Sequence, residues 1–208
     1  MRDGFKIIDT DCHQMETQSV WSDYIDPVFK GREPRKQMVN GHFVQVVEGE
    51  PVQPEQEEGK YPMHAPEFLA AAAKAMQRFK RASDTKFSAE SRLTDMDEEG
   101  VDIQIMYPTI GGQLLGREWK DPELLAAVCR AYNDWSREYC AKDPKRLRWA
   151  AMLPLQATDL AIEEAKRAAA NGAVSFYVRP NPVLGRGLHH EDNWPLWRVV
   201  EQLGKPLS

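Results

Sequence analysis

Near its N-terminus the chain reads Lys6-Ile7-Ile8-Asp9-Thr10-Asp11-Cys12-His13, a short apolar run followed by three possible metal ligands. We expect residues 6–9 to form a buried strand. Side chains two positions apart on a strand point to the same side, so Asp9, Asp11 and His13 alternate and the last two converge. A carboxylate beside an imidazole suits a divalent cation such as zinc. The same residues also fit an ordinary strand end, with acids that cap the next helix and a half-buried histidine.

The composition is that of an ordinary globular domain. With 208 residues, of which 42% are hydrophobic and 28% charged, the chain can bury a sizeable core. Its net charge of −5 provides no basic surface, so we expect neither nucleic acid nor membrane as a partner. No apolar run reaches the ~18 residues of a membrane span, and no signal-peptide core precedes the first strand. Cys12, Cys129 and Cys140 match no disulfide or zinc-knuckle spacing, and we expect a cytoplasmic protein.

Strand-like and helix-like segments alternate along the rest of the chain. Apolar runs predict strands at 101–107, 148–153, 173–178 and, as a beginning only, 204–208. Periodicity and capping residues predict helices at 21–29, 69–81, 88–99, 121–142, 158–170 and 194–203. This alternation is typical of parallel βαβ units, and it fits both a doubly wound sheet and a (β/α)8 barrel. No phosphate-binding loop is present, and we interpret Gly111-Gly112 and Gly185-x-Gly187 as turn glycines.

Residues at about 35–66 differ in character from this scaffold. An Asn-Gly pair at 40–41, between two short apolar runs, predicts a β-hairpin. The Pro- and Glu-rich remainder predicts an exposed loop. We therefore interpret 1–208 as one domain with an insertion at about 35–66. His42 and His64 lie in this insertion, and we expect them to be solvated; the alternative is a lid that reaches over the barrel mouth.

Several motifs follow one another in a fixed order outside this insertion. They are Ile8-Asp9-Thr10-Asp11-Cys12-His13 with Glu16 nearby, Arg92-Leu93-x-Asp95-Met96-Asp97-x-x-Gly100-Val101-Asp102, Tyr107-Pro108-Thr109, Tyr132-Asn133-Asp134-Trp135, Pro144-x-Arg146-Leu147, Gly172-Ala173-Val174, Arg179-Pro180-Asn181-Pro182 and Pro195-Leu196-Trp197. In order and spacing they resemble the amidohydrolase superfamily. The resemblance is to its metal-dependent branch that includes aminocarboxymuconate semialdehyde decarboxylase.

This resemblance implies a (β/α)8 TIM barrel, an α/β fold with its site at the carboxyl ends of the strands. The family's first strand supplies two metal ligands as H-x-H or as acid-x-His, and these are Asp11 and His13 here. The family's other ligands are a His after the fifth strand and an Asp after the eighth. The chain ends within its expected fifth strand, so we expect an N-terminal fragment of about four and a half β/α units. Its open strand edge and uncovered apolar helix faces favour a homo-oligomer.

The resemblance also implies the chemistry. A bound Zn or Mn ion would polarise a small carboxylated or cyclic organic substrate for decarboxylation or hydrolysis. Arg179, after the fourth strand, is a candidate partner for a substrate carboxylate; a salt bridge to a neighbouring loop is the alternative. We expect His189-His190 to be an exposed loop pair, and Cys12 to be a core residue on the face opposite the ligands. Two further alternatives are an inert or partner-bound remnant of such an enzyme and a metal-free doubly wound binding domain.

Overall fold

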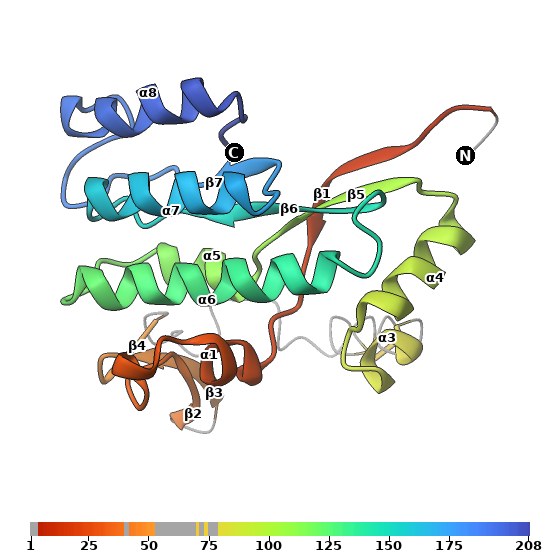
Figure 1. The fold of residues 1–208 in the computed structure, drawn as a ribbon. Helices are drawn as coiled ribbons and strands as arrows, with labels where there is room; N and C mark the ends of the chain where they lie inside the picture. The colour runs from red at the N-terminus through yellow and green to blue at the C-terminus, as the bar shows by residue number, and fades with distance from the viewer. Residues whose placement is uncertain (1–3, 40–41, 53–69, 71–72, 75–78) are drawn as a thin grey trace.

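The computed structural model of the chain describes residues 4–39, 42–52, 70, 73–74 and 79–208 (Figure 1). Its main sheet has four parallel strands in the order β1-β5-β6-β7. These strands are β1 (Ile8–His13), β5 (Ile103–Tyr107), β6 (Leu147–Met152) and β7 (Ser175–Tyr177). The end of the chain continues the sheet, because Leu207 forms a parallel bridge with Phe176 of β7. The expected start of a fifth strand is therefore confirmed.

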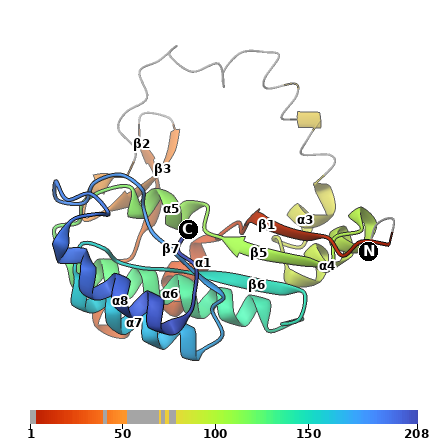
Figure 2. The same ribbon diagram turned by 90° about the horizontal axis from the view of Figure 1, so that it is seen from above.

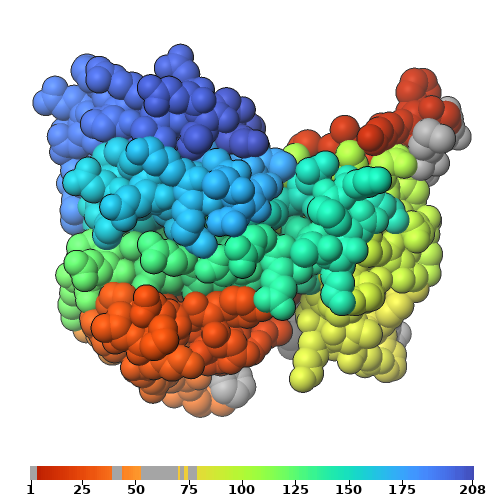
Figure 3. Space-filling view, in the orientation of Figure 1, coloured from red at the N-terminus to blue at the C-terminus, as the bar shows by residue number. Residues whose placement is uncertain are grey.

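Helices connect the strands and cover one face of the sheet. The large helices α6 (Pro122–Cys140), α7 (Thr158–Ala170) and α8 (Trp194–Leu203) lie side by side along it (Figure 2). Smaller helices are α1 (Gln18–Tyr24), α3 (Lys80–Asp84), α4 (Ala89–Glu99) and α5 (Ile110–Leu115). In Figure 3 the surfaces of α8, α7, α6 and α1 follow one another as successive layers. No described helix has the length and apolar character needed to cross a membrane.

The order of the strands decides between the two sheet architectures. Neighbours in the sheet are also successive strands of this α/β layer in the chain, from β1 to β7 and on to Leu207. A doubly wound sheet instead reverses its order at a switch point, where helices change faces. The described residues contain no such reversal in the parallel sheet. The fold is therefore the first part of a (β/α)8 barrel, a half barrel of parallel strands, as the family resemblance implied.

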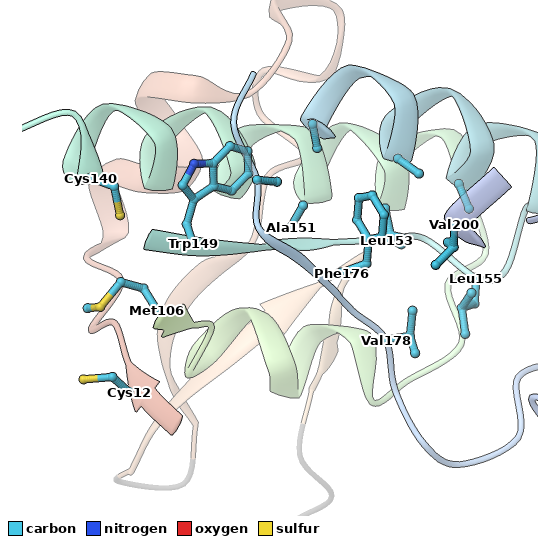
Figure 4. Close-up of a cluster of buried hydrophobic side chains, with 14 of the residues drawn as sticks. Cys12, Met106, Cys140, Trp149, Ala151, Leu153, Leu155, Phe176, Val178 and Val200 are labelled. Atoms are coloured by element: carbon cyan, nitrogen blue, oxygen red, sulfur yellow. The ribbon is translucent and has the colours of Figure 1, made fainter. Parts of the chain in front are cut away.

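The core lies between the sheet and its helices. Trp149 and Leu153 from β6 and its exit pack with Phe176 of β7 beneath α7 and α8 (Figure 4). Phe176 and Leu153 are completely buried, and Trp149 is 4% exposed. Burying such side chains stabilises the fold by roughly 1.5–3 kcal/mol each. The helices are thus held on the sheet by apolar contact.

The predicted hairpin is present and forms a separate sheet. Strands β2 (Arg35–Val39), β3 (His42–Val47) and β4 (Glu50–Pro51) are antiparallel and lie in the order β2-β3-β4. Val47 is buried in a cluster with residues of α1 and α6, which anchors this sheet to the barrel. The turn pair at 40–41 and the predicted loop with His64 lie outside the described residues.

Five local predictions need correction or restriction. The buried strand expected at 6–9 is β1, which runs from Ile8 to His13 and is mostly exposed, because no described strand covers its other edge. The helix expected at 21–29 is α1 followed by a separate 3-10 turn, η1 (Pro27–Phe29), which the Asp26 side chain caps. The capping residues that predict a helix at 158–170, Thr158 and Asp159, do not cap it: its N-cap is Ala157, and the Thr158 hydroxyl donates instead to the Asp192 carbonyl. Most of the helix expected at 69–81 lies outside the described residues.

The last correction concerns Gly111-Gly112, which lie inside α5 and not in a turn. A Cβ on Gly111 would stand 2.5 Å from the Met152 Sδ atom, and one on Gly112 would stand 3.0 Å from the Tyr177 hydroxyl. Because α5 packs closely against the strand ends, a side chain at either glycine would force Met152 or Tyr177 to shift. Their role is therefore steric, and a pattern of local turn residues does not reveal it.

Candidate metal centre

A bulge in β1 decides which of its side chains share a face. From Asp9 to Cys12 the strand advances three residues while its partner β5 advances two. The extra residue reverses the alternation, so Asp9 lies on the Cys12 face, while Asp11 and His13 occupy the other. Burial, together with the nearby Asp9 carboxylate, raises the pKa of Cys12 to about 11. The expectation that Asp9 alternates with the ligand pair is therefore wrong.

Asp11 and His13 line an open cleft of about 620 Å³. The cleft runs along the strands, from Val174 and Ser175 at the start of β7 to Tyr107 and His13 at the carboxyl ends of β5 and β1. Its lining residues are Thr10, Asp11, His13, Ile105, Tyr107, Val174, Ser175, Tyr177, Pro206 and Ser208. The rings of Tyr107 and Tyr177 meet edge to face with centroids 6.0 Å apart. The cleft thus combines two polar ligand candidates with an aromatic wall.

The ring of His13 has a defined orientation. Its Nδ1 atom lies 3.0 Å from the carbonyl oxygen of Pro108. Since a carbonyl only accepts, Nδ1 carries the hydrogen and Nε2 of the neutral ring keeps its lone pair. That Nε2 atom lies 3.7 Å from Oδ1 of Asp11, and both side chains are accessible, at 53% and 91% exposure. Metal-binding histidines typically donate their second ring N–H in this way.

The donor set fits part of a metal coordination shell. A carboxylate oxygen and an imidazole nitrogen are ligands that both zinc and manganese accept. Across the described residues, no group of three or more His, Cys, Asp or Glu side chains is placed to hold a metal ion. Asp11 and His13 therefore form a two-residue donor pair, and a complete shell needs further ligands.

Arg92, from the motif at 92–102, forms hydrogen bonds with the last two residues of β1. Its guanidinium donates to the His13 carbonyl oxygen at 2.8 Å and to the Cys12 Sγ atom at 3.0 Å. Cys12 itself is 9% exposed and packs in the core, so the prediction that it faces away from the ligands is confirmed. Arg92 thus holds β1 in place where the ligand pair ends.

Glu16 is a buried carboxylate next to the site, and sequence reasoning noted it without assigning a role. It is 5% exposed and accepts hydrogen bonds from the backbone N–H groups of Thr109, Ile110 and Gly111. Burial raises the pKa of its carboxyl group, and the backbone donors offset only part of that effect. In the sequence, Glu16 is visible as an acidic residue three positions after His13. Its backbone partners lie more than 90 positions away in the chain, so the sequence does not reveal them.

Arg179 lies apart from the ligand pair. Its guanidinium donates to the carbonyl oxygens of Leu115 at 3.1 Å and Pro182 at 2.7 Å, and the residue is 9% exposed. Burial lowers the pKa of Arg179. The side chain does not line the cleft of Asp11 and His13. Its predicted contact with a substrate carboxylate stays a prediction.

The histidine pair after β7 is part of loop structure. His189 is exposed, and the His190 ring accepts a hydrogen bond from the Asp192 backbone N–H at 3.3 Å. His190 thereby caps the 3-10 turn η3 (Glu191–Asn193). His189 is thus exposed in the loop as expected, whereas His190 is half-buried and caps η3.

A second cleft, of about 570 Å³, lies between the hairpin and the start of α6. Its cations are paired with carboxylates: Arg32 with Asp121 at 2.7 Å, Arg35 with Glu33 at 3.5 Å and Lys120 with Glu50 at 3.7 Å. Because these charges neutralise one another, the cleft offers no net charge for a ligand. The ligand pair on β1 remains the better candidate site.

Comparison with known proteins identifies relatives of this chain in sequence and in structure. The 2-amino-3-carboxymuconate-6-semialdehyde decarboxylase of Caenorhabditis elegans is 27% identical over 135 residues, which cover 55% of this chain and 33% of that protein. An amidohydrolase from Mycobacterium avium subsp. paratuberculosis K-10 has a TM-score of 0.71 at 22% identity, covering 98% of this chain and 57% of that one. A 5-carboxyvanillate decarboxylase from Novosphingobium aromaticivorans, complexed with manganese and 4-hydroxy-3-methoxy-5-nitrobenzoic acid, has a TM-score of 0.62 at 20% identity, covering 99% and 50%.

The chain spans about a third of the length of the curated relatives it matches. The two structural likenesses establish the fold. A sequence model described as amidohydrolase matches residues 8–208, nearly the whole chain. The chain therefore belongs to the amidohydrolase family.

Proposed function

We propose that Asp11 and His13 are the first-strand ligands of a divalent metal ion in a decarboxylase of the amidohydrolase family. The observation that carries this proposal is the His13 ring, which donates from Nδ1 to Pro108 and presents Nε2 beside the Asp11 carboxylate. Both residues line one accessible cleft, and His13 is the last residue of β1, at the carboxyl end of that strand. That is where barrel enzymes place their catalytic groups.

The substrate class that we propose is a small carboxylated molecule, aromatic or otherwise unsaturated. The curated relative in C. elegans and the structural neighbour from N. aromaticivorans are both named as decarboxylases of such acids. When bound, the metal would polarise a substrate oxygen and offset its charge. Tyr107 and Tyr177 offer an edge-to-face aromatic wall against which a planar substrate packs. Hydrolysis of a cyclic substrate by the same pair is the alternative.

Manganese and zinc are both candidates for the metal. The hard carboxylate of Asp11 favours manganese more than a second imidazole would, and the structural neighbour holds manganese.

We further propose a cytoplasmic, homo-oligomeric protein. Cys12, Cys129 and Cys140 are free and buried, which suits a reducing compartment.

Metal binding tests the proposal directly. We expect the purified chain to bind Mn²⁺ or Zn²⁺ at one ion per molecule in titration calorimetry and in metal analysis after desalting. Asp11→Ala and His13→Ala each remove a ligand, so each should weaken binding by more than the ~10–100-fold typical of losing a residue that only hydrogen-bonds a ligand. The matched control is His190→Ala, which removes a histidine near Asp192 on a remote loop and should leave binding unchanged.

The same samples test the chemistry. Metal-loaded wild-type protein should release carbon dioxide from 5-carboxyvanillate or a related hydroxybenzoate faster than Asp11→Ala does. A wild-type chain that retains no metal, or whose metal binding ignores both substitutions, would contradict the proposal. That result would favour the alternative of an inert or partner-bound remnant.

A further inference from the structure

One peptide group lies between Glu16 and His13. The carbonyl of Pro108 accepts from His13 Nδ1 at 3.0 Å, and the N–H of Thr109 donates to the Glu16 carboxylate at 3.0 Å. These two atoms belong to the same peptide unit. In a trans peptide the C=O and N–H bonds are coplanar and point in opposite directions. The carboxylate and the imidazole are therefore bound to opposite ends of one rigid dipole.

Further backbone hydrogen bonds fix the position of the Glu16 carboxylate. Glu16 also accepts from the N–H groups of Ile110 at 3.0 Å and Gly111 at 2.9 Å, and it is 5% exposed. Beside it, the Thr109 hydroxyl donates to the Gln14 carbonyl at 2.6 Å. These bonds join the chain leaving β1 to the chain leaving β5. The Pro108–Thr109 peptide consequently has little freedom to rotate.

We propose that Glu16 is a positioning residue that orients His13 through the Pro108–Thr109 peptide. The inference rests on the proposed role of His13 as a metal ligand. A carboxylate that accepts from an N–H polarises that peptide, and its C=O then becomes a stronger acceptor for the imidazole N–H. The arrangement is equivalent to a carboxylate–histidine–metal triad with a peptide group between the first two members. It fixes the tautomer in which Nε2 faces the cleft.

A purely structural role for Glu16 makes different predictions. If Glu16 only ties α5 to β1, its replacement lowers stability without changing the ring of His13. If it acts through the peptide, replacement changes the His13 tautomer and the metal affinity as well. Nitrogen-15 NMR of the imidazoles distinguishes the two, because protonated and unprotonated ring nitrogens have different shifts. The chain has five histidines, so His13→Ala assigns the signal.

The experiment compares the wild-type chain with Glu16→Gln, in metal-free form at pH 8. Wild-type His13 should be in the Nδ1–H tautomer, and Glu16→Gln should show a mixture, since an amide places an N–H where an acceptor is needed. Mn²⁺ affinity of Glu16→Gln should fall about 10–100-fold. Glu16→Asp keeps the charge and should recover part of both effects. The control is Glu164→Gln, a buried carboxylate that bonds Arg167 and Asn133 and has no link to His13.

The outcomes separate this inference from the proposed function. A wild-type His13 in the Nε2–H tautomer overturns the inference, and that measurement needs only the His13→Ala variant that assigns the signal and no substitution of Glu16. An unchanged tautomer and affinity in a folded Glu16→Gln overturns it too. If the wild-type chain binds no metal but the tautomer shifts in Glu16→Gln, the proposed function fails and the coupling stands.

Discussion

One extra residue in β1 determines the chemistry on each side of the strand. The bulge between Asp9 and Cys12 places Asp9 against the core-facing thiol and leaves Asp11 and His13 on the cleft face. Without it, three possible ligands would face the cleft and the thiol would lose its acidic neighbour. The ligand pair is thus a consequence of strand pairing as much as of spacing.

The environment of Cys12 leads to a prediction about its reactivity. With a pKa of about 11, its thiolate is a minor species at pH 8, so alkylation by iodoacetamide should be slow in the folded chain. The rate should rise about tenfold for each pH unit up to that value. Because the folded pKa is raised, the protonated thiol stabilises the fold below its unfolded pKa. This contribution is lost as the pH rises toward 11. Mass spectrometry of labelled peptides measures the rate, and equal rates in folded and urea-unfolded protein would contradict the prediction.

At the scale of elements, caps explain why the helices begin where they do. The Asp121 side chain accepts from the N–H groups of Glu123 and Leu124 at the start of α6, and Pro122 occupies the first turn. At the other end of a helix, Gly100 adopts a left-handed conformation with φ of 74° after α4. Both signals are local, and both were readable from the sequence.

Replacing the α6 cap should destabilise the fold measurably. Asp121→Ala should lower the free energy of unfolding by about 1 kcal/mol at pH 7, measured by urea denaturation. Partial burial raises the pKa of Asp121, but Arg32 and the N–H donors outweigh it, so the net pKa is lowered. The stabilisation is therefore present above the unfolded pKa, and the difference from wild type should shrink as the pH falls below about 4. Asp159→Ala is the control, because α7 has no side-chain cap hydrogen bond, and it should cost only a few tenths of a kcal/mol.

At the scale of the whole molecule, the parallel sheet has an open edge. Among the described strands, β1 pairs only with β5, and Ile8 on β1 is 52% exposed. An exposed strand edge with an apolar side chain is a template for pairing with another chain. This feature supports the proposed homo-oligomer.

Charge at that edge should weaken self-association. Burying one isoleucine is worth roughly 1.5–3 kcal/mol, so Ile8→Lys should lower the association constant of the chain by at least about tenfold in analytical ultracentrifugation. Val28→Lys is the matched control, because Val28 is 75% exposed on η1 and lies outside the main sheet. Equal effects of the two substitutions would show that β1 is not the contact.

The sequence by itself determined the elements that depend on nearby residues. Residues 194–203 were predicted as a helix and form α8, and the cap of α6 and the end of α4 were located correctly. The resemblance supplied the barrel and the ligand pair. The helices and their ends were predictable because apolar periodicity, caps and left-handed glycines act over a few residues.

Only the tertiary structure decided the features that depend on residues far apart in the chain. His13 meets the Pro108 carbonyl across 95 positions, and Glu16 meets Thr109 across 93. The bulge depends on the register with β5, and the glycines of α5 depend on the closeness of Met152. No local pattern encodes which backbone atom lies opposite a given side chain. The sequence therefore indicated the candidate ligands, and the packing of the barrel oriented their side chains.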